Sequence, residues 1–401
     1  MPPRVDAERI RADFEALSSI GATADGGVER PTFSDAHLEA RAWFLERARA
    51  AGLETRVDAA GNHSAVLPAG ARTLLLGSHL DSVPDGGRYD GALGVVAALE
   101  VLRSVHDAGL ALPVTLEAID FTDEEGTLVG LLGSWAVAGA LPPETLAAPR
   151  GGRDALVAGL ARVGLEESHL ADARRDPASL AGYLELHIEQ GPVLEREGVD
   201  IGIVTGIVGS RSFRLMFTGA SGHAGTTPME ARRDAGVAAA AFVVAARDLV
   251  VRGYPGCVVT VGSIAFEPGA FNVIPGRARL ALEFRSLDSD ELDAMEAELL
   301  DLAGAQGVEV EVEPVGHWEA TPLDAEVQAA IRGAAAALGL STRDLPSGAG
   351  HDAQALAAVT RSGMLFVPSQ GGVSHSPREH TAWEDCVNGA NVLLGVALAL
   401  A

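Results

Sequence analysis

One stretch of strand, loop and helix decides the fold of this chain: Thr73-Leu74-Leu75-Leu76-Gly77-Ser78-His79-Leu80-Asp81-Ser82-Val83-Pro84-Asp85-Gly86-Gly87-Arg88-Tyr89-Asp90-Gly91, followed by the helix-like run 92–105. Its polar residues follow an apolar strand, and open α/β sheets bind their ligands at that end. His79 and Asp90 are a nitrogen and oxygen donor pair that suits zinc, manganese or cobalt. Asp81 stands where it could hold the other imidazole nitrogen of His79. A polar surface turn is the simpler alternative, because Pro84 to Gly87 favour a turn by themselves.

Length and composition predict a globular protein of two domains. The chain has 401 residues, of which 47% are apolar, and its mean hydropathy is +0.18. No apolar run reaches the ~18 residues of a membrane span. Residues 1–6 contain no apolar segment, so we expect no signal peptide. The two cysteines, Cys257 and Cys386, are too far apart for a thiolate metal site or a disulfide scaffold. A cytoplasmic protein is therefore predicted.

The charged residues exclude several classes of function. The net charge of −25 argues against nucleic acid and anionic membranes as partners. All thirty basic residues are arginine, and the chain contains no lysine. Schiff-base enzymes, Walker-type phosphate loops and pyridoxal phosphate enzymes each need a lysine, so none of these classes fits.

Strands alternate with helices in the first half of the chain and again at its end. This alternation predicts an α/β domain with a mostly parallel sheet. The expected strands are 74–78, 114–121, 183–188 and 364–367. The expected helices are 34–52, 92–105, 131–140, 323–338 and 383–400, and Ser34 is the N-cap of the first of them.

The pattern changes between residues 209 and 320. Strands are expected at 211–218, 257–265, 277–286 and 308–312, with helices at 232–249 and 289–304. Four strands and two long helices in so short a segment predict a compact α+β domain. We expect it to be inserted between two parts of one catalytic domain, residues 1–208 and 321–401.

Four further polar clusters follow predicted strands or lie in glycine-rich loops. They are Asp123-Glu124-Glu125-Gly126, the segment 184–189 with His187, the segment 221–228 with His223, and the segment 373–380 with His375, which has His351 upstream. Adjacent carboxylates can point in different directions, so that one binds a metal while the other acts as a general base. A solvated acidic turn and structural histidines are the alternatives. No Gly-x-Ser-x-Gly elbow or nucleotide-binding fingerprint competes with the metal hypothesis.

Together these motifs resemble the hydantoinase/carbamoylase family of amidohydrolases. That family includes N-carbamoyl-L-amino-acid hydrolases, β-ureidopropionases and allantoate amidohydrolases, and it is related to the carboxypeptidase G-type metallopeptidases. The likeness runs from about Ser34 to the end of the chain. It implies a zinc-peptidase-like catalytic domain, an inserted domain that serves as lid and dimerisation domain, two divalent metal ions and a homodimer.

The resemblance also implies a role for individual residues. The metal ligands would be His79, Asp90 as the bridging carboxylate, Glu125, His187 and His375. Glu124 would be the general base, Asp81 would orient His79, and His223 would stabilise the oxyanion and bind substrate. The remaining substrate-binding residues would be Gln190, Arg211, Asn272, Arg285, Gly350 and His351. Arg211 follows Gly209-Ser210, where relatives often have glutamine before the arginine.

The expected reaction is hydrolysis of the carbamoyl bond of an N-carbamoyl-L-amino acid by a metal-activated water. It would release the amino acid, carbon dioxide and ammonia. Allantoate or β-ureidopropionate is the alternative substrate. A dipeptidase or aminopeptidase is the alternative enzyme, but the peptidase branch commonly has aspartate where His187 stands. A binding protein without activity would have no use for a free base at Glu124. Zinc is the expected metal, and manganese, cobalt and nickel also suit these ligands.

Overall fold

The computed structural model describes residues 3–401. It divides into two compact units, one ending at Thr205 and resuming as Leu323–Ala401, the other being Gly206–Pro322. We call them the first and the second unit. No helix within residues 3–401 is long and apolar enough to cross a membrane.

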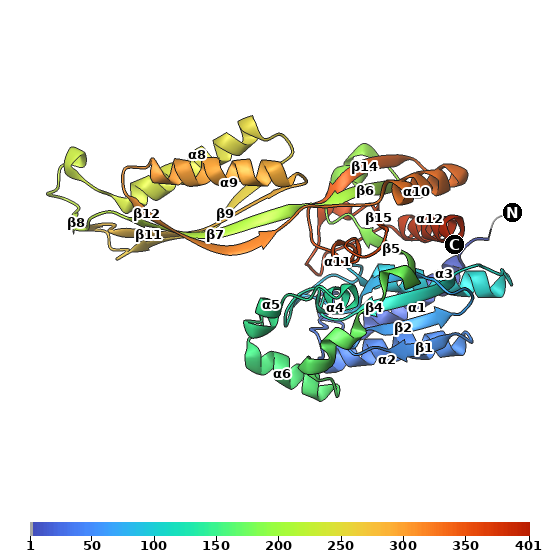
Figure 1. The fold of residues 1–401 in the computed structure, drawn as a ribbon. Coiled ribbons are helices and arrows are strands. Elements are labelled where there is room, and N and C mark those ends of the chain that lie inside the picture. The colour runs from blue at the N-terminus through green and yellow to red at the C-terminus, as the bar shows by residue number, and fades with distance from the viewer. Residues whose placement is uncertain (1–2) are drawn as a thin grey trace. The chain divides into compact units, whose positions relative to one another are not determined.

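The first unit is built on one mixed sheet (Figure 1). Its strands are β1 (Glu54–Val57), β2 (His63–Leu67), β3 (Thr73–His79), β4 (Thr115–Phe121), β5 (Leu180–Ile188), β6 (Ile201–Ile207), β14 (Thr342–Ser347) and β15 (Ser362–Val367). The spatial order is β1-β2-β4-β3-β5-β15-β6, and β14 also pairs with β6. The four central strands β4, β3, β5 and β15 run parallel. Their carboxyl ends therefore share one edge, where ligands bind in such sheets.

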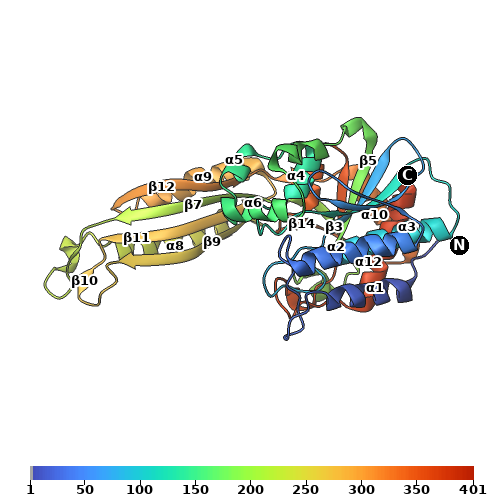
Figure 2. The same ribbon diagram turned by 90° about the horizontal axis from the view of Figure 1, so that it is seen from below.

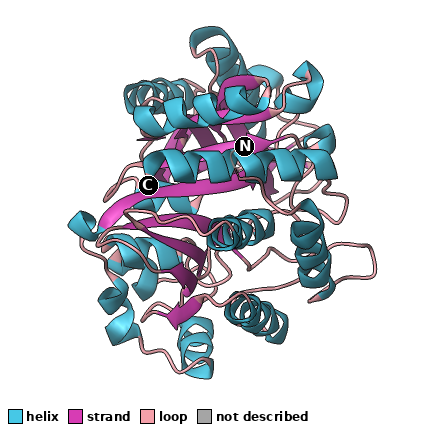
Figure 3. Cartoon of the chain, turned by 90° about the vertical axis from the view of Figure 1, so that its right-hand side faces the viewer, coloured by secondary structure: helices cyan, strands magenta, loops and turns pink. Residues whose placement is uncertain are grey.

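Helices lie on both faces of this sheet (Figure 3). They are α1 (Ala7–Ser19), α2 (Asp35–Ala50), α3 (Ala92–Asp107), α4 (Leu132–Ala138), α5 (Pro143–Ala147), α6 (Arg153–Arg162), α7 (Val193–Glu197), α10 (Ala325–Leu338), α11 (Asp352–Leu356) and α12 (Trp383–Leu400). Leu184 and Leu186 of β5 join the main core with α3 and α12. Successive strand residues point to opposite faces, so Glu185 and His187 face the other side. There the Oε2 atom of Glu185 accepts a hydrogen bond from the Ala353 N–H of α11 at 3.1 Å.

The second unit is a four-stranded antiparallel sheet covered by two helices (Figure 2). Its elements are β7 (Gly209–Thr218), β8 (Gly222–His223), β9 (Val258–Glu267), β10 (Val273–Ile274), β11 (Arg277–Ser286), β12 (Glu309–Trp318), β13 (Thr321–Pro322), α8 (Ala235–Gly253) and α9 (Ser289–Gly304). The sheet order is β12-β7-β11-β9. Alternating residues of β7 and β11, among them Phe217 and Phe284, form a separate core with α8 and α9.

The predicted fold class is confirmed: a mostly parallel α/β sheet accompanies an α+β unit of four long strands and two long helices. Ser34 caps α2 as expected, its side chain accepting the N–H of His37. The last strand of the second unit was predicted too short, at 308–312. β12 continues to Trp318 because a shift in register between Pro314 and Gly316 lets an edge strand accommodate the proline.

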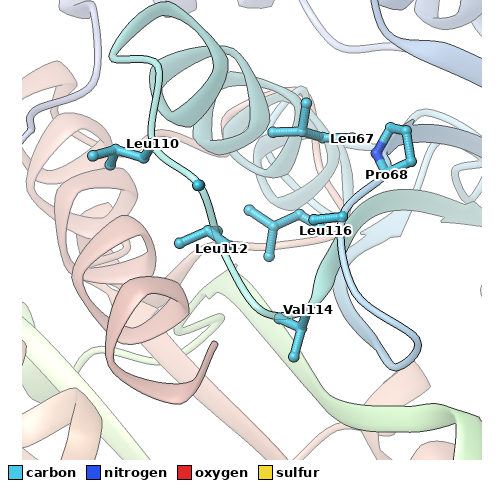
Figure 4. Close-up of a pocket in the computed structure, with 8 residues that line it drawn as sticks. Leu67, Pro68, Leu110, Leu112, Val114 and Leu116 are labelled. Carbon is cyan, nitrogen blue, oxygen red and sulfur yellow. The ribbon is translucent and has the colours of Figure 1, made fainter.

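One apolar cavity of about 350 Å³ lies away from the carboxyl ends of the central strands (Figure 4). It is lined by Leu67 at the end of β2 and Pro68 after it, and by Leu110, Leu112 and Val114 before β4 and Leu116 within β4. β4 starts at this cavity and ends beside the polar clusters, so the cavity and the clusters occupy opposite ends of the strand. It contains no titratable side chain that could take part in catalysis.

Candidate metal centre

His79 and Asp90 meet at the end of β3. His79 is the last residue of the strand and is buried. Asp90 directly precedes Gly91, the N-cap of α3, which has a φ of 61°. A Cβ atom at Gly91 would lie 2.4 Å from the His79 ring, so only glycine lets the loop approach this closely. The His79 Nε2 and Asp90 Oδ1 atoms are 3.6 Å apart.

The two oxygens of Asp90 face different sets of ligands. Oδ1 lies 3.0 Å from the Nε2 atom of His187, at the end of β5. Oδ2 lies 3.3 Å from the Nε2 atom of His375. The result is two groups that share Asp90, namely His79–Asp90–His187 and Asp90–Glu125–His375, and the ligand atoms within each group lie within 4.8 Å of one another. We call them the first and the second triad.

The backbone orients the two histidines of the first triad. The Nδ1 atom of His79 is 3.0 Å from the carbonyl oxygen of Asp81. The Nδ1 atom of His187 is 2.8 Å from the carbonyl oxygen of Ile188. Each Nδ1 therefore donates a hydrogen to a carbonyl, and Nε2 is the ring nitrogen that faces Asp90 in both residues.

Asp81 acts mainly on the loop after β4. Its Oδ1 accepts the Glu124 N–H at 3.3 Å, and its Oδ2 accepts the Glu125 N–H at 3.2 Å and the Thr32 hydroxyl at 3.1 Å. Asp81, which is expected to orient His79, contacts the Nδ1 atom of His79 through its carbonyl oxygen, and its carboxylate lies 3.7 Å from the same nitrogen.

The adjacent glutamates point in different directions, Glu124 toward His79 and Glu125 toward His375. The Oε2 atom of Glu124 lies 3.6 Å from the Nε2 atom of His79. The Oε2 atom of Glu125 lies 3.5 Å from the Nε2 atom of His375 and belongs to the second triad. Asp123 shapes the loop that carries both glutamates. It has a φ of 59°, and its buried carboxylate accepts hydrogen bonds from the N–H groups of residues 128, 129 and 130.

The charges at this centre are strongly coupled. Burial opposes ionisation of Asp90, but hydrogen bonds from His187, His375 and His79 outweigh it and hold the pKa of Asp90 well below its usual range. The bond to Asp90 raises the pKa of His375 to about 9. Burial, with the charge of Asp90, raises the pKa of Glu125 to about 7. Burial also raises the pKa of Glu124 well above its usual value, although His79 opposes this shift.

These residues fit a pair of divalent cations. Imidazole nitrogens and carboxylate oxygens are ligands of zinc, manganese, cobalt and nickel. The Oε1 atom of Glu125 is buried and has no hydrogen-bond partner among residues 3–401, as expected for an atom that binds a cation. In each triad two side chains complement the shared carboxylate of Asp90. Glu124 belongs to neither triad, which leaves it available as a base.

Three predicted substrate-binding positions lie beside this centre. The Nε2 atom of Gln190 donates to the Oδ2 atom of Asp90 at 2.8 Å. His351 is buried, and its ring meets that of His187 edge-on with centroids 4.5 Å apart. Its Nε2 atom is 2.8 Å from the hydroxyl of Ser347. Gly350 precedes His351 in the loop between β14 and α11.

Four other predicted residues, of which Arg211 is described below, belong to the second unit. His223 is exposed in the two-residue strand β8, and its Nδ1 accepts the Gly225 N–H at 3.0 Å. Asn272 precedes β10, the partner strand of β8, and its carbonyl accepts the Ala224 N–H at 3.0 Å. Arg285 lies on β11, where its guanidinium contacts Glu283 at 2.7 and 2.9 Å.

Arg211, also predicted to bind substrate, is engaged by other residues of the second unit. Its side chain is 1% exposed. Its guanidinium donates to Asp293 and Glu319, each at 3.1 Å, and to the carbonyl of Trp318 at 2.9 Å. A substrate carboxylate would have to displace these partners. Arg211 therefore stabilises the second unit by joining β7 to α9 and to the end of β12.

Two buried carboxylates of the centre were not among the predicted site residues. Asp123 holds the loop of the glutamates, as described above. Glu379 bonds to the backbone of Asp90 and stands four residues after His375. Both lie within the polar clusters of the sequence, but other members of those clusters carry the predicted roles. Asp123 and Glu379 are distinguished by the hydrogen bonds that they accept from backbone N–H groups, which residue spacing does not reveal.

Comparison with known proteins places the chain among characterised hydrolases. The family model for peptidase family M20/M25/M40 matches residues 75–399. An N-carbamoyl-L-amino acid amidohydrolase from Geobacillus stearothermophilus is 38% identical over 99% of both chains. An allantoate amidohydrolase from Bacillus subtilis is 34% identical over 97% of this chain and 96% of that protein. A crystal structure of a hydantoinase/carbamoylase family amidase from Burkholderia multivorans has a TM-score of 0.91 and 36% identity, covering 100% of this chain and 99% of that one.

Cation binding at the second triad should strengthen as the pH rises. His375, which faces Asp90, Glu125 and Glu379, has a pKa of about 9, and Glu125 has a pKa of about 7. Both pKa values are raised, so below pH 7 a cation must displace two protons, and between pH 7 and 9 it must displace one. The affinity for Mn²⁺ should therefore rise up to about tenfold per pH unit above pH 7, and more steeply below it. Calorimetric titration at pH 6, 7 and 8, in two buffers of different ionisation enthalpy, measures affinity and proton release. An affinity that does not change with pH would contradict these charge states.

Proposed function

This chain belongs to peptidase family M20/M25/M40 and to its hydantoinase/carbamoylase amidohydrolases, and we propose that it hydrolyses the carbamoyl carbon–nitrogen bond of N-carbamoyl-L-amino acids. The observation that carries this proposal is the pair of triads that share Asp90, with Glu124 outside both. Relatives that match nearly the whole chain at 32–38% identity and are named for this substrate class support it. His187, a histidine where the peptidase branch commonly has aspartate, favours an amidohydrolase over a dipeptidase.

The proposed ligands are His79, Asp90 and His187 for one divalent cation, and Asp90, Glu125 and His375 for the other. Two cations bound there supply Lewis-acid polarisation of the carbonyl and lower the pKa of water. Glu124 accepts a proton from the attacking water and passes it to the leaving nitrogen. Burial raises the pKa of Glu124 well above its usual value, which favours uptake of a proton by this carboxylate. Overall, one water and one N-carbamoyl amino acid give an amino acid, carbon dioxide and ammonia. Zinc is the proposed native metal.

The substrate-binding residues that the family resemblance implies are part of this proposal. His223 could donate a hydrogen bond to the oxyanion. Its Nδ1 atom accepts a backbone N–H, which places the hydrogen of the neutral ring on Nε2. Arg285 offers a planar guanidinium for the substrate carboxylate. Asn272, Gln190, Gly350 and His351 complete the proposed set of substrate-binding residues.

A screen of ammonia release tests this function. Purified protein with added Zn²⁺ or Mn²⁺ should release ammonia from N-carbamoyl-L-amino acids, and a chelator should abolish the release. Allantoate, β-ureidopropionate and dipeptides belong in the same screen. Turnover of allantoate or β-ureidopropionate alone would show that one of these alternative compounds is the substrate. Turnover of dipeptides alone would contradict the proposal.

Glutamine at each of the adjacent glutamates should separate base from ligand. Glu124→Gln keeps the size of the side chain but cannot accept a proton, so kcat should fall by at least about 10²–10⁴-fold while two metals stay bound. Glu125→Gln should instead lose or weaken one metal, because Glu125 belongs to the second triad. The measurement is kcat beside metal content for both variants. If Glu124→Gln loses a metal and keeps its turnover per metal, the two roles are reversed.

The second unit has a surface suited to a second copy of this chain. β9 is an outer strand of its sheet, and no strand covers its outer side within residues 3–401. Ile264 and Phe266 of β9 are each 43% exposed. Val237, Val244 and Val251 of α8 are all exposed, and their seven-residue spacing places them on one stripe of the helix. Long apolar edges of this kind are normally covered, and a twin strand would continue the ladder across a two-fold axis. A homodimer through β9 and α8, in the cytoplasm, is therefore part of the proposal.

Light scattering should find a dimer, and the double variant Val244→Arg/Ile264→Arg should be monomeric. Charged side chains at these positions would be buried without partners in the dimer, which is unfavourable. Val157→Arg on α6, another exposed valine, is the control and should leave the dimer intact. A monomeric wild-type protein with full activity would contradict the proposed dimer.

A further inference from the structure

Glu379 connects two distant loops at the metal centre. Its side chain is buried, and its Oε1 atom accepts the N–H groups of Tyr89 at 2.8 Å and of Asp90 at 3.0 Å. Asp90 lies 289 positions earlier in the chain. The Oε2 atom of Glu379 accepts the hydroxyl of Ser374 at 3.0 Å, and Ser374 directly precedes His375. One carboxylate thus contacts both the loop of Asp90 and the loop of His375.

Ser374 extends this contact to the carboxylate of Asp90. Its hydroxyl oxygen lies 3.2 Å from the Oδ2 atom of Asp90, as well as 3.0 Å from Glu379. A hydroxyl has one hydrogen, so these two carboxylates share a single donor. Glu379 therefore fixes the backbone of Asp90, while Ser374 and Gln190 both contact the oxygen that faces His375.

Gly87 lets the loop close around Glu379. A Cβ atom at residue 87 would lie 2.0 Å from the Cδ and Oε1 atoms of Glu379, so any side chain there would displace the carboxylate. Gly87 is not among the residues with positive φ, so its role is to provide space. The loop from Gly87 to Asp90 therefore depends on a carboxylate from the other end of the chain.

We propose that Glu379 is a positioning residue that sets the distance between Asp90 and His375 and thereby the affinity of the second triad for its cation. This inference rests on the proposed function, because it assumes that the two triads bind metal. Glu379 itself is no ligand, since both of its oxygens are engaged by Tyr89, Asp90 and Ser374. A residue that only stabilised the fold would change the melting temperature without favouring loss of one metal over the other.

Glu379→Gln removes the charge and keeps the shape of the side chain. Glutamine keeps one acceptor oxygen and replaces the other with an N–H donor, so the charge-assisted contacts to the two loops become weaker neutral ones. Partners that orient metal ligands typically contribute 10–100-fold to metal affinity. We expect the affinity of the second triad for Mn²⁺ to fall by about that factor. The change at the first triad should be smaller, because Ser374 contacts the Asp90 oxygen that faces His375 and not the oxygen that faces His187.

Gly87→Ala is an independent route to the same defect, because it displaces the carboxylate without removing it. If both variants act through one contact, the double variant should lose less affinity than the sum of the two single losses. Glu384→Gln, an exposed glutamate at the start of α12, is the matched control and should bind Mn²⁺ like the wild type.

The experiment titrates Mn²⁺ alone into the full-length chain and follows stoichiometry by calorimetry and the bridged Mn²⁺ pair by electron paramagnetic resonance. The wild type should show two ions per chain and an exchange-coupled signal. At the same Mn²⁺ concentration Glu379→Gln should show one ion and the signal of isolated Mn²⁺. Should Glu379→Gln fail to fold, Gly87→Ala and Ser374→Ala decide the question by the same readouts.

Two outcomes separate the inference from the function on which it rests. Folded variants that bind two ions with wild-type affinity and keep the coupled signal would overturn the role of Glu379 and leave the metal pair intact. A wild type that binds fewer than two ions would overturn the metal pair itself.

Discussion

The whole centre depends on the buried carboxylate of Asp90. A carboxylate out of water is strongly disfavoured unless charged or hydrogen-bonding groups surround it. Here the imidazoles of His79, His187 and His375 stabilise the charge and hold the pKa of Asp90 well below its usual range. Because each oxygen faces a different set of partners, the same group serves both triads. Displacing Asp90 would therefore disturb both at once.

The sheet brings the histidines together, and buried carboxylates hold the loops that carry the other proposed ligands. His79 and His187 end parallel strands, so their positions follow from the register of β3 with β5. The glutamates and His375 lie on loops, which need more support. Asp81 holds the N–H groups of Glu124 and Glu125, and Glu379 holds that of Asp90. Buried carboxylates of the first unit thus hold the backbone of the proposed ligands in place. This agrees with a site whose geometry is fixed before substrate arrives.

The sequence predicted the fold class and most of the long elements, because strand ends and helix starts carry local signals. β14 escaped prediction because only Leu345 and Ser347 of its six residues are buried. α1 was not among the predicted helices, although the helical spacing of Ile10, Phe14 and Leu17 is a usable signal. The division of roles between Glu124 and Glu125 came from the family resemblance, since two adjacent identical residues look alike in sequence. Local sequence does not reveal the partners of Arg211, because Asp293 and Glu319 lie far from it in the chain.

Anomalous X-ray diffraction from crystals grown with Mn²⁺ would locate the bound cations directly. Two peaks are expected about 3.5–4 Å apart, the usual separation in bridged two-metal sites. One peak should lie against His79 and His187, the other against Glu125 and His375, and both should contact Asp90. A single peak at full Mn²⁺ occupancy, or two peaks that do not share Asp90, would contradict this arrangement.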